Sequence, residues 1–132
     1  MSVDRISNML STIKNCSMSG RDFVEVPYSK ECESIAKVLE QKGFLEDLKV
    51  FKKEKSSAKM LHIGLVKEDG KAKVTQVRRI SKPGRRIYKG AVELRGVLQG
   101  LGVLVVSTSR GIMSGTEARK KKLGGEVLCE AY

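Results

Sequence analysis

The stretch Val103-Leu104-Val105-Val106-Ser107 is a continuous apolar run that ends in a hydroxyl residue. A short run of this kind, rich in β-branched residues, is typical of a strand that is buried in a core. Thr108-Ser109-Arg110-Gly111 follows directly, and Ser114-x-x-Glu117 then gives a capping-box pattern that opens a short helix. Gly124-Gly125 ends this helix before a last predicted strand at 126–130. The C-terminal part is therefore predicted as strand, loop, helix and strand.

The N-terminal part has the spacing of two amphipathic helices. Ile6, Met9, Leu10 and Ile13 recur at helical intervals, and Asp4 stands where a carboxylate suits the helix dipole. A second helix is predicted to begin after Ser29, a good cap residue, and to end at Gly43. Its apolar face consists of Ile35, Val38 and Leu39.

Turn signals separate the remaining elements. Asp69-Gly70 predicts a hairpin between strands at 61–66 and 74–80, and Pro83-Gly84 marks another turn. The other predicted elements are strands at 23–26 and 48–51, a strand or extended arm at 86–89, and a helix at 92–98 closed by Gly100.

This order of elements indicates an α+β fold. The first part reads α-β-α-β-β and the second is rich in strands with short helices. We therefore predict two small lobes, an N-terminal α/β lobe at 1–75 and a C-terminal α+β lobe at 76–132.

The charge of the chain points to a polyanionic partner. The 132 residues carry a formal charge of +11, and residues 67–132 hold 15 basic and 6 acidic side chains. The stretch 71–92 contains eight Lys and Arg and no acid, and a second cluster is Arg119-Lys120-Lys121-Lys122. The repulsion among so many clustered cations destabilises the protein unless an anion neutralises them, and nucleic acid is the commonest polyanion. A basic surface without a partner is the alternative.

Several function classes find no support in the sequence. No apolar stretch approaches the 20 or so residues of a membrane span, and the N-terminus lacks a signal-peptide pattern, so we expect a cytoplasmic address and no membrane partner. Three cysteines without a Cys-x-x-Cys pair indicate idle thiols and no metal site. His62 is the only histidine and has no neighbouring nucleophile, so no catalytic residue, cofactor or small-molecule substrate is predicted.

The segment Ser107-Thr108-Ser109-Arg110-Gly111 is the candidate recognition loop. Its hydroxyls and guanidinium can bond phosphates, ribose and base edges, and Gly111 permits a tight turn. Ordinary turn chemistry is the alternative, and a hydrolase using this loop would need a base that the neighbouring sequence lacks. Tyr88, inside the basic stretch, could stack on an unpaired base or be a half-buried strand residue. Glu126 could accept from a base edge, orient a basic partner or hold a loop, or be a solvated strand-start acid.

These motifs together resemble the bacterial-type small-subunit ribosomal protein S8 family over nearly the whole chain. The resemblance is carried by Gly100-Leu-Gly102, the 107–111 loop, Ala118-Arg119 and Gly124-Gly125-Glu126. The segments Arg79–Gly84, Arg86–Tyr88, Ser29-Lys30 and the first helix also match. Arg5, Asn8 and Cys32 depart from the usual pattern.

The resemblance implies a structural rRNA-binding protein that binds the central domain of small-subunit rRNA and helps to assemble that subunit. It implies neighbouring ribosomal proteins as further partners, a ribosomal location that an organelle could also provide, and in some relatives repression of translation through their own messenger RNA. It assigns RNA contact to the loop and to residues beside it, on the first helix and in the basic stretch. The predicted RNA-binding residues are Ser107, Thr108, Ser109, Arg110, Gly111, Tyr88, Glu126, Lys82, Arg86, Lys30, Arg5 and Lys14.

Overall fold

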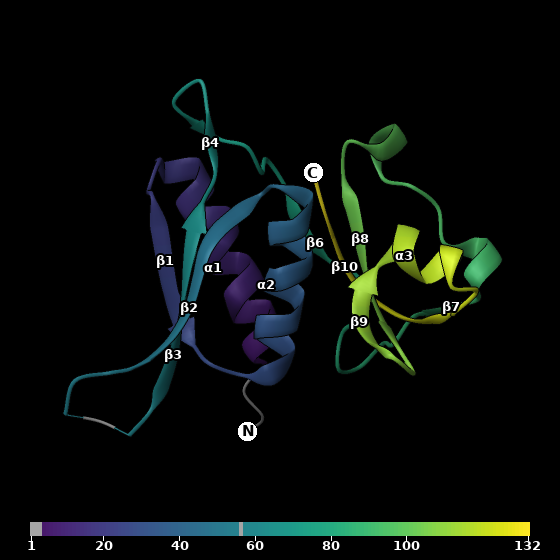
Figure 1. The fold of residues 1–132 in the computed structure, drawn as a ribbon, viewed down its shortest axis with the longest axis horizontal. Coiled ribbons are helices and arrows are strands. Elements are labelled where there is room, and N and C mark those ends of the chain that lie inside the picture. The colour runs from purple at the N-terminus through teal and green to yellow at the C-terminus, as the bar shows by residue number, and fades with distance from the viewer. Residues whose placement is uncertain (1–3, 56) are drawn as a thin grey trace. The chain divides into compact units, whose positions relative to one another are not determined.

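The computed structural model describes residues 4–55 and 57–132, and its fold is drawn in Figure 1. The chain forms two units, which we call unit 1, ending at Thr75, and unit 2, Gln76–Tyr132. Both combine helical segments with antiparallel strands. The predicted α+β class is therefore confirmed.

Unit 1 places two helices against a three-stranded antiparallel sheet with the strand order β1-β3-β2. The Asp4 carboxylate accepts a hydrogen bond from the Ser7 N–H, and the Ser29 hydroxyl accepts one from the Cys32 N–H. These bonds satisfy N–H groups that have no partner inside the helices, which is why the helices begin there. The elements are α1 (Arg5–Ser19), β1 (Phe23–Pro27), α2 (Lys30–Lys42), β2 (Leu45–Lys52) and β3 (Lys59–Leu65).

The predicted helical stripes are buried in unit 1. The apolar residues of both helices face inward together with those of the central strand β3. The helix and strand periods thus lead to the same apolar layer. The fully buried large side chains are Met9, Ile13, Ile35, Leu39, Leu45, Leu61, Ile63, Leu65 and Val74.

The hairpin predicted around Asp69-Gly70 is wrong in its strands. The turn is present, but it joins the short strands β4 (Lys67–Glu68) and β5 (Lys71–Ala72). The longer strand β3 already has β1 on one side and β2 on the other, so it has no edge left for a third partner. The turn residues were identified correctly, but the strands that pair across the turn depend on which strand edges the sheet leaves open.

Unit 2 is built on a five-stranded antiparallel sheet. Its strand order is β6-β10-β8-β9, and β7 also pairs with β10. The central strand is therefore β10, which comes last in the chain. The elements are β6 (Val77–Arg79), β7 (Tyr88–Lys89), η1 (Ala91–Glu93), η2 (Leu98–Gly100), β8 (Val103–Thr108), β9 (Gly111–Ser114), α3 (Gly115–Lys120) and β10 (Gly125–Ala131).

The predicted buried strand and capped helix form the core of unit 2. Val106 of β8 and Val127 of β10 pack with Met113, Ala118 and Leu94. The Ser114 hydroxyl accepts a hydrogen bond from the Glu117 N–H and so begins α3, as predicted. The sequence did not predict β9, which pairs with β8 and turns the candidate loop into a hairpin.

The helix predicted at 92–98 is wrong. The segment contains two short 3₁₀ turns, η1 and η2, and Leu98 and Gln99 have positive φ angles of 46° and 54°. Val92, Gly96 and Val97 all lower helix propensity, and the stretch is too short to compensate.

The three cysteines differ in their burial. The three thiols are free, with Cys32 and Cys129 buried and Cys16 half-buried. Burial raises the pKa of the Cys129 thiol to about 12. Within the described residues, no helix is long and apolar enough to cross a membrane.

Candidate nucleic-acid interface

Three predicted site residues that are far apart in the sequence form a cross-strand row in unit 2. Glu126 of β10 lies opposite Tyr88 of β7 on one side and opposite Ser107 of β8 on the other. Residues paired in this way project from the same face of a sheet, with Cβ atoms about 5 Å apart. The next pair along, Val106 and Val127, belongs to the apolar core. The row therefore projects from the opposite face.

An ion pair neutralises the carboxylate in this row. Arg86 Nη1 lies 3.2 Å from Glu126 Oε2. The Glu126 side chain is 15% exposed and the Arg86 side chain 50% exposed, while Tyr88 is 68% exposed. Of the roles considered for Glu126, this contact is compatible with the orientation of a basic partner. Tyr88 has the exposure that stacking on a base would need.

The candidate loop is the hairpin tip, Thr108–Gly111, between β8 and β9. The Thr108 hydroxyl accepts a hydrogen bond from the Arg110 N–H at 3.1 Å and donates one to the Gly111 carbonyl at 2.8 Å. Gly111 has φ 112°, a conformation that favours glycine. Thr108 and Gly111 therefore hold the turn, whereas Ser109 and Arg110 are exposed at its end. Within residues 4–55 and 57–132, neither the Ser107 nor the Ser109 side chain has a hydrogen-bond partner.

A second loop, the basic turn Lys82–Arg86, is anchored by a residue that sequence reasoning missed. Ser81 is fully buried, and its hydroxyl accepts a hydrogen bond from the Ile87 N–H at 2.9 Å and donates to the Ile87 carbonyl at 3.2 Å. Backbone bonds in both directions between Lys82 and Arg85 close the turn. The Pro83-Gly84 signal located the turn, but a serine between Ile80 and Lys82 carried no sign of burial.

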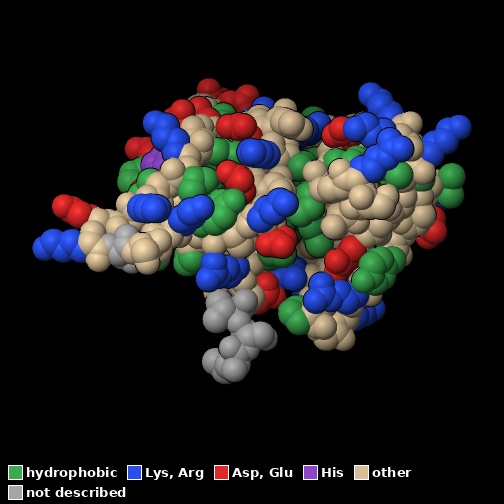
Figure 2. Space-filling model, turned by 60° about the horizontal axis from the view of Figure 1, so that its bottom comes forward, with side chains coloured by type: hydrophobic (Ala, Val, Ile, Leu, Met, Phe, Trp, Pro, Cys, Tyr) green, Lys and Arg blue, Asp and Glu red, His purple; other side chains and the backbone are tan. Residues whose placement is uncertain are grey.

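The carboxylates of unit 2 are all engaged within the protein. The unit has 12 Lys and Arg against 4 Asp and Glu. Glu117, Glu126 and Glu130 pair with Lys121, Arg86 and Arg78, and the Glu93 carboxylate accepts from the Gly90 N–H. On the face drawn in Figure 2, Lys and Arg side chains project from the surface. An anionic ligand would therefore meet cations whose charge is largely uncompensated.

The predicted contacts in the first half of the chain lie in unit 1. The Arg5 guanidinium donates to the Tyr28 carbonyl, which brings Arg5 beside the segment leading to Lys30. Arg5 and Lys30 are exposed and are the first residues of α1 and α2. Lys14 is half-buried and lies nine residues further along α1, about 13 Å by helical rise. The structure therefore brings Arg5 to the segment before Lys30, whereas Lys14 lies further along α1.

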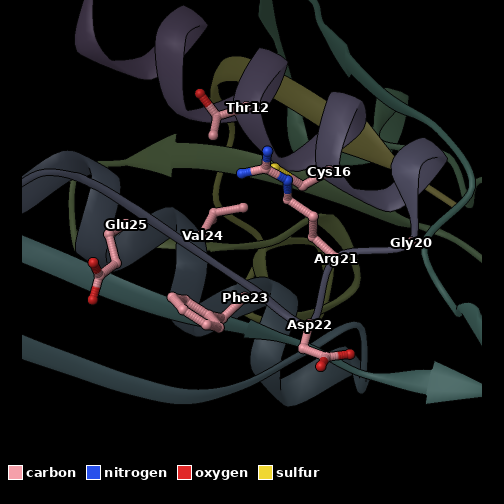
Figure 3. Close-up of a pocket in the computed structure, with 8 residues that line it drawn as sticks. All are labelled: Thr12, Cys16, Gly20, Arg21, Asp22, Phe23, Val24 and Glu25. Atoms are coloured by element: carbon pink, nitrogen blue, oxygen red, sulfur yellow. The ribbon is translucent and has the colours of Figure 1, made fainter.

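Unit 1 also contains a hollow of about 420 Å³ between α1 and β1, shown in Figure 3. Thr12 and Cys16 line it from the helix, and residues 20–25 from the strand side. The Arg21 side chain extends toward Cys16, while the Asp22 and Glu25 carboxylates point away from it (Figure 3). None of the predicted site residues lines this hollow.

The described residues contain no candidate metal cluster, and the single histidine of the chain contacts two neighbouring side chains. Among them, no group of three or more His, Cys, Asp and Glu side chains could hold a metal ion. His62 stacks on Phe23 with 5.0 Å between ring centroids, and its Nδ1 lies 3.3 Å from Glu25 Oε2. His62 thus lies on strand β3 and contacts two residues of the neighbouring strand β1.

Comparison with known proteins gives matches along the whole length. The family model described as ribosomal protein S8 matches residues 4–132. A protein of Rhodopirellula baltica named small ribosomal subunit protein uS8 is 44% identical over 131 residues, 98% of each chain. One of Nitratidesulfovibrio vulgaris with the same name is 41% identical over 132 residues, all of both chains. Marchantia polymorpha has a small ribosomal subunit protein uS8c that is 44% identical over 135 residues, also all of both chains.

The family match includes both units and every element that positions the candidate interface. It begins at Asp4, which caps α1, and ends at Tyr132. The matches also span 98% and 100% of these two relatives' own lengths, so the similarity extends beyond a shared motif. The chain belongs to the ribosomal protein S8 family.

Proposed function

We propose that this chain, a ribosomal protein and not an enzyme, binds the central domain of small-subunit rRNA through unit 2. The observation that carries the proposal is the cross-strand row Tyr88–Glu126–Ser107 beside the hairpin tip. The row joins an exposed aromatic ring, a neutralised carboxylate and a hydroxyl that has no partner among the described residues. Irregular RNA offers unstacked bases and 2′-hydroxyls that such a surface can bind.

Affinity and recognition come from different parts of this surface. The unpaired Lys and Arg side chains of unit 2 supply salt-dependent attraction to phosphates. The Ser107 and Ser109 hydroxyls and the Tyr88 ring supply contacts to sugar and base. As a constituent of the small subunit, the chain would also contact neighbouring ribosomal proteins.

The test is affinity for the isolated rRNA central domain against a perfect duplex of equal length, across a salt series. We expect selective binding that persists near physiological salt, since hydroxyl and stacking contacts are screened less than phosphate contacts. Equal binding to both RNAs that collapses with salt would contradict the proposal. An element of the chain's own messenger RNA, added as competitor, tests whether the same surface also serves repression of translation.

Ser109 and Thr108 allow recognition to be separated from loop structure. Ser109→Ala should weaken binding of the cognate RNA by about 1 kcal/mol, one hydrogen bond, and leave the thermal unfolding of the protein unchanged. Thr108→Val should lower both the affinity for the RNA and the melting temperature of the protein, because the Thr108 hydroxyl holds the turn. Fluorescence anisotropy and calorimetry measure the two effects. Unchanged affinity in Ser109→Ala would remove this residue from the interface.

A further inference from the structure

Among the described residues of unit 1, the two helices cover one face of the three-stranded sheet, and we call the other face the open face. Residues directly opposite each other in neighbouring strands project from the same face. Val24, Leu61 and Ile63 are buried on the side of the helices, so the residues that alternate with them form the open face. The strand pairings give three rows across β1, β3 and β2, which are Phe23–Gly64–Glu46, Glu25–His62–Lys49 and Pro27–Met60–Phe51.

The open face is more apolar than a sheet face in contact with water usually is. Antiparallel sheets with one solvated face normally place polar residues there. Here Phe23 is 51% exposed and Pro27 is exposed, while Phe51 and Met60 are half-buried. Aromatic residues and Met are enriched in the cores of protein–protein interfaces. A partner that covered these side chains would remove their apolar surface from water.

The Phe23 ring is held in place beside a carboxylate. It stacks on His62 with 5.0 Å between the ring centroids, and the His62 Nδ1 lies 3.3 Å from Glu25 Oε2. The Glu25 side chain keeps 42% of its surface exposed, so it can accept a further hydrogen bond. An arginine guanidinium suits such a site, because it can stack on an aromatic face and also pair with a carboxylate.

The charge of the open face favours a protein partner over RNA. The three rows contain two exposed carboxylates, Glu25 and Glu46, against one lysine, Lys49. Unit 2, by contrast, has 12 Lys and Arg against 4 Asp and Glu. Surfaces that stack RNA bases on aromatic rings combine them with cations that attract the backbone, whereas these carboxylates would repel it. A basic protein segment would meet the opposite charge here.

We propose that the open face is the docking surface for a basic segment of a neighbouring small-subunit protein, whose arginine stacks on Phe23 and pairs with Glu25. The inference rests on the proposed function, which places the chain in the small subunit, and it adds a surface for one of the protein neighbours. This surface belongs to unit 1, whereas the cross-strand row and the hairpin tip belong to unit 2.

The first measurement is photo-crosslinking within purified small subunits that have incorporated the chain. The photoreactive amino acid p-benzoylphenylalanine replaces Phe23 in one variant and Met18, which is 75% exposed near the end of α1, in the control. We expect position 23 to form an adduct with a small-subunit protein at a segment rich in Lys and Arg, and position 18 not to form this adduct. An adduct with rRNA, with a second copy of the chain or with an acidic segment would overturn the inference, and so would the absence of any adduct.

The second measurement reverses the charge of the open face. Glu25→Lys/Glu46→Lys is compared with Glu40→Lys/Glu68→Lys, which changes the net charge equally at exposed carboxylates outside the three rows. In chains photolabelled at position 23, we expect the first pair to lower the adduct yield about tenfold and the second to leave it unchanged, because like charges across an interface oppose docking. Equal adduct yields in the two variants would overturn the inference. All four carboxylates are exposed, so both variants should keep the melting temperature of the wild type.

Affinity for the rRNA central domain separates this inference from the proposed function. Both double variants should bind the rRNA at least as tightly as the wild type, because each gains positive charge. A loss of rRNA affinity confined to Glu25→Lys/Glu46→Lys would show that the open face contacts RNA and would overturn the inference. If the wild type neither selects the central domain nor enters small subunits, the proposed function itself is refuted.

Discussion

Gly125→Ala should destabilise the protein by about 3 kcal/mol, the upper range for overpacking, and abolish selective RNA binding. A Cβ atom at this position would lie 2.1 Å from the carbonyl oxygen of Ser107 and 2.9 Å from its carbonyl carbon. Both are backbone atoms of the neighbouring strand β8, so a change of rotamer cannot relieve the contact. The two strands must separate where Glu126 pairs with Ser107, and the cross-strand row is lost with them.

Gly84→Ala is the matched control for this prediction. Among the described residues, no heavy atom lies within 4 Å of the position that a Cβ atom on Gly84 would take, and its φ is not positive. The added methyl group therefore meets open space, and we expect a change within about 0.5 kcal/mol. Denaturant unfolding of the wild type and both variants measures the difference. A Gly125→Ala midpoint equal to that of the control would show that β8 and β10 do not approach as closely as the structure has them.

Local signals allowed much of the fold to be predicted from the sequence. Caps and periodicity act within a few residues, so Ser29, Ser114 and the stripe containing Met9 and Ile13 located their helices correctly. The apolar run at 103–107 likewise located β8. Each of these signals depends on neighbours along the chain.

Strand pairing could not be predicted in the same way. The turn at Asp69-Gly70 was correct and its strands were wrong, because the sheet decides which strands become partners. For the same reason the sequence named Tyr88, Ser107 and Glu126 separately but could not show that they form one row. The buried hydroxyl of Ser81 was missed because its partners are backbone groups six residues away, which no side-chain pattern marks.

Arg86→Ala should weaken binding of the rRNA central domain by about 2 kcal/mol, roughly 30-fold, which is more than the loss of one surface cation. The change removes a positive charge from the interface. It also leaves the Glu126 carboxylate, only 15% exposed, without the guanidinium 3.2 Å away. An uncompensated carboxylate facing RNA phosphates repels them, and truncating one member of a shielded pair costs about 2 kcal/mol or more. Because Arg86 is half-exposed, we expect the loss of affinity to lie at the lower end of this range, at about 2 kcal/mol.

Arg95→Ala supplies the comparison for a simple loss of charge. Arg95 is exposed in the same unit and, among the described residues, has no carboxylate partner. Its removal should act mainly on the salt dependence of binding. The slope of log affinity against log salt concentration should fall by about 1 if Arg95 contacts a phosphate. Arg86→Ala should instead keep much of its effect at high salt, because the unpaired Glu126 remains beside the RNA.

A double-mutant cycle then measures how much of the affinity lost in Arg86→Ala is due to the unpaired Glu126 carboxylate. Adding Glu126→Gln to Arg86→Ala removes the unpaired negative charge, so the double variant should recover about 1 kcal/mol of the lost affinity. Glu126→Gln alone leaves Arg86 without its ion-pair partner and should change the affinity little. Recovery in the double variant would show that the carboxylate serves to hold Arg86 in place. If the double variant binds as weakly as Arg86→Ala or more weakly, Glu126 itself accepts a hydrogen bond from the RNA. Such a result would make the carboxylate, and not the guanidinium, the recognition group of the row.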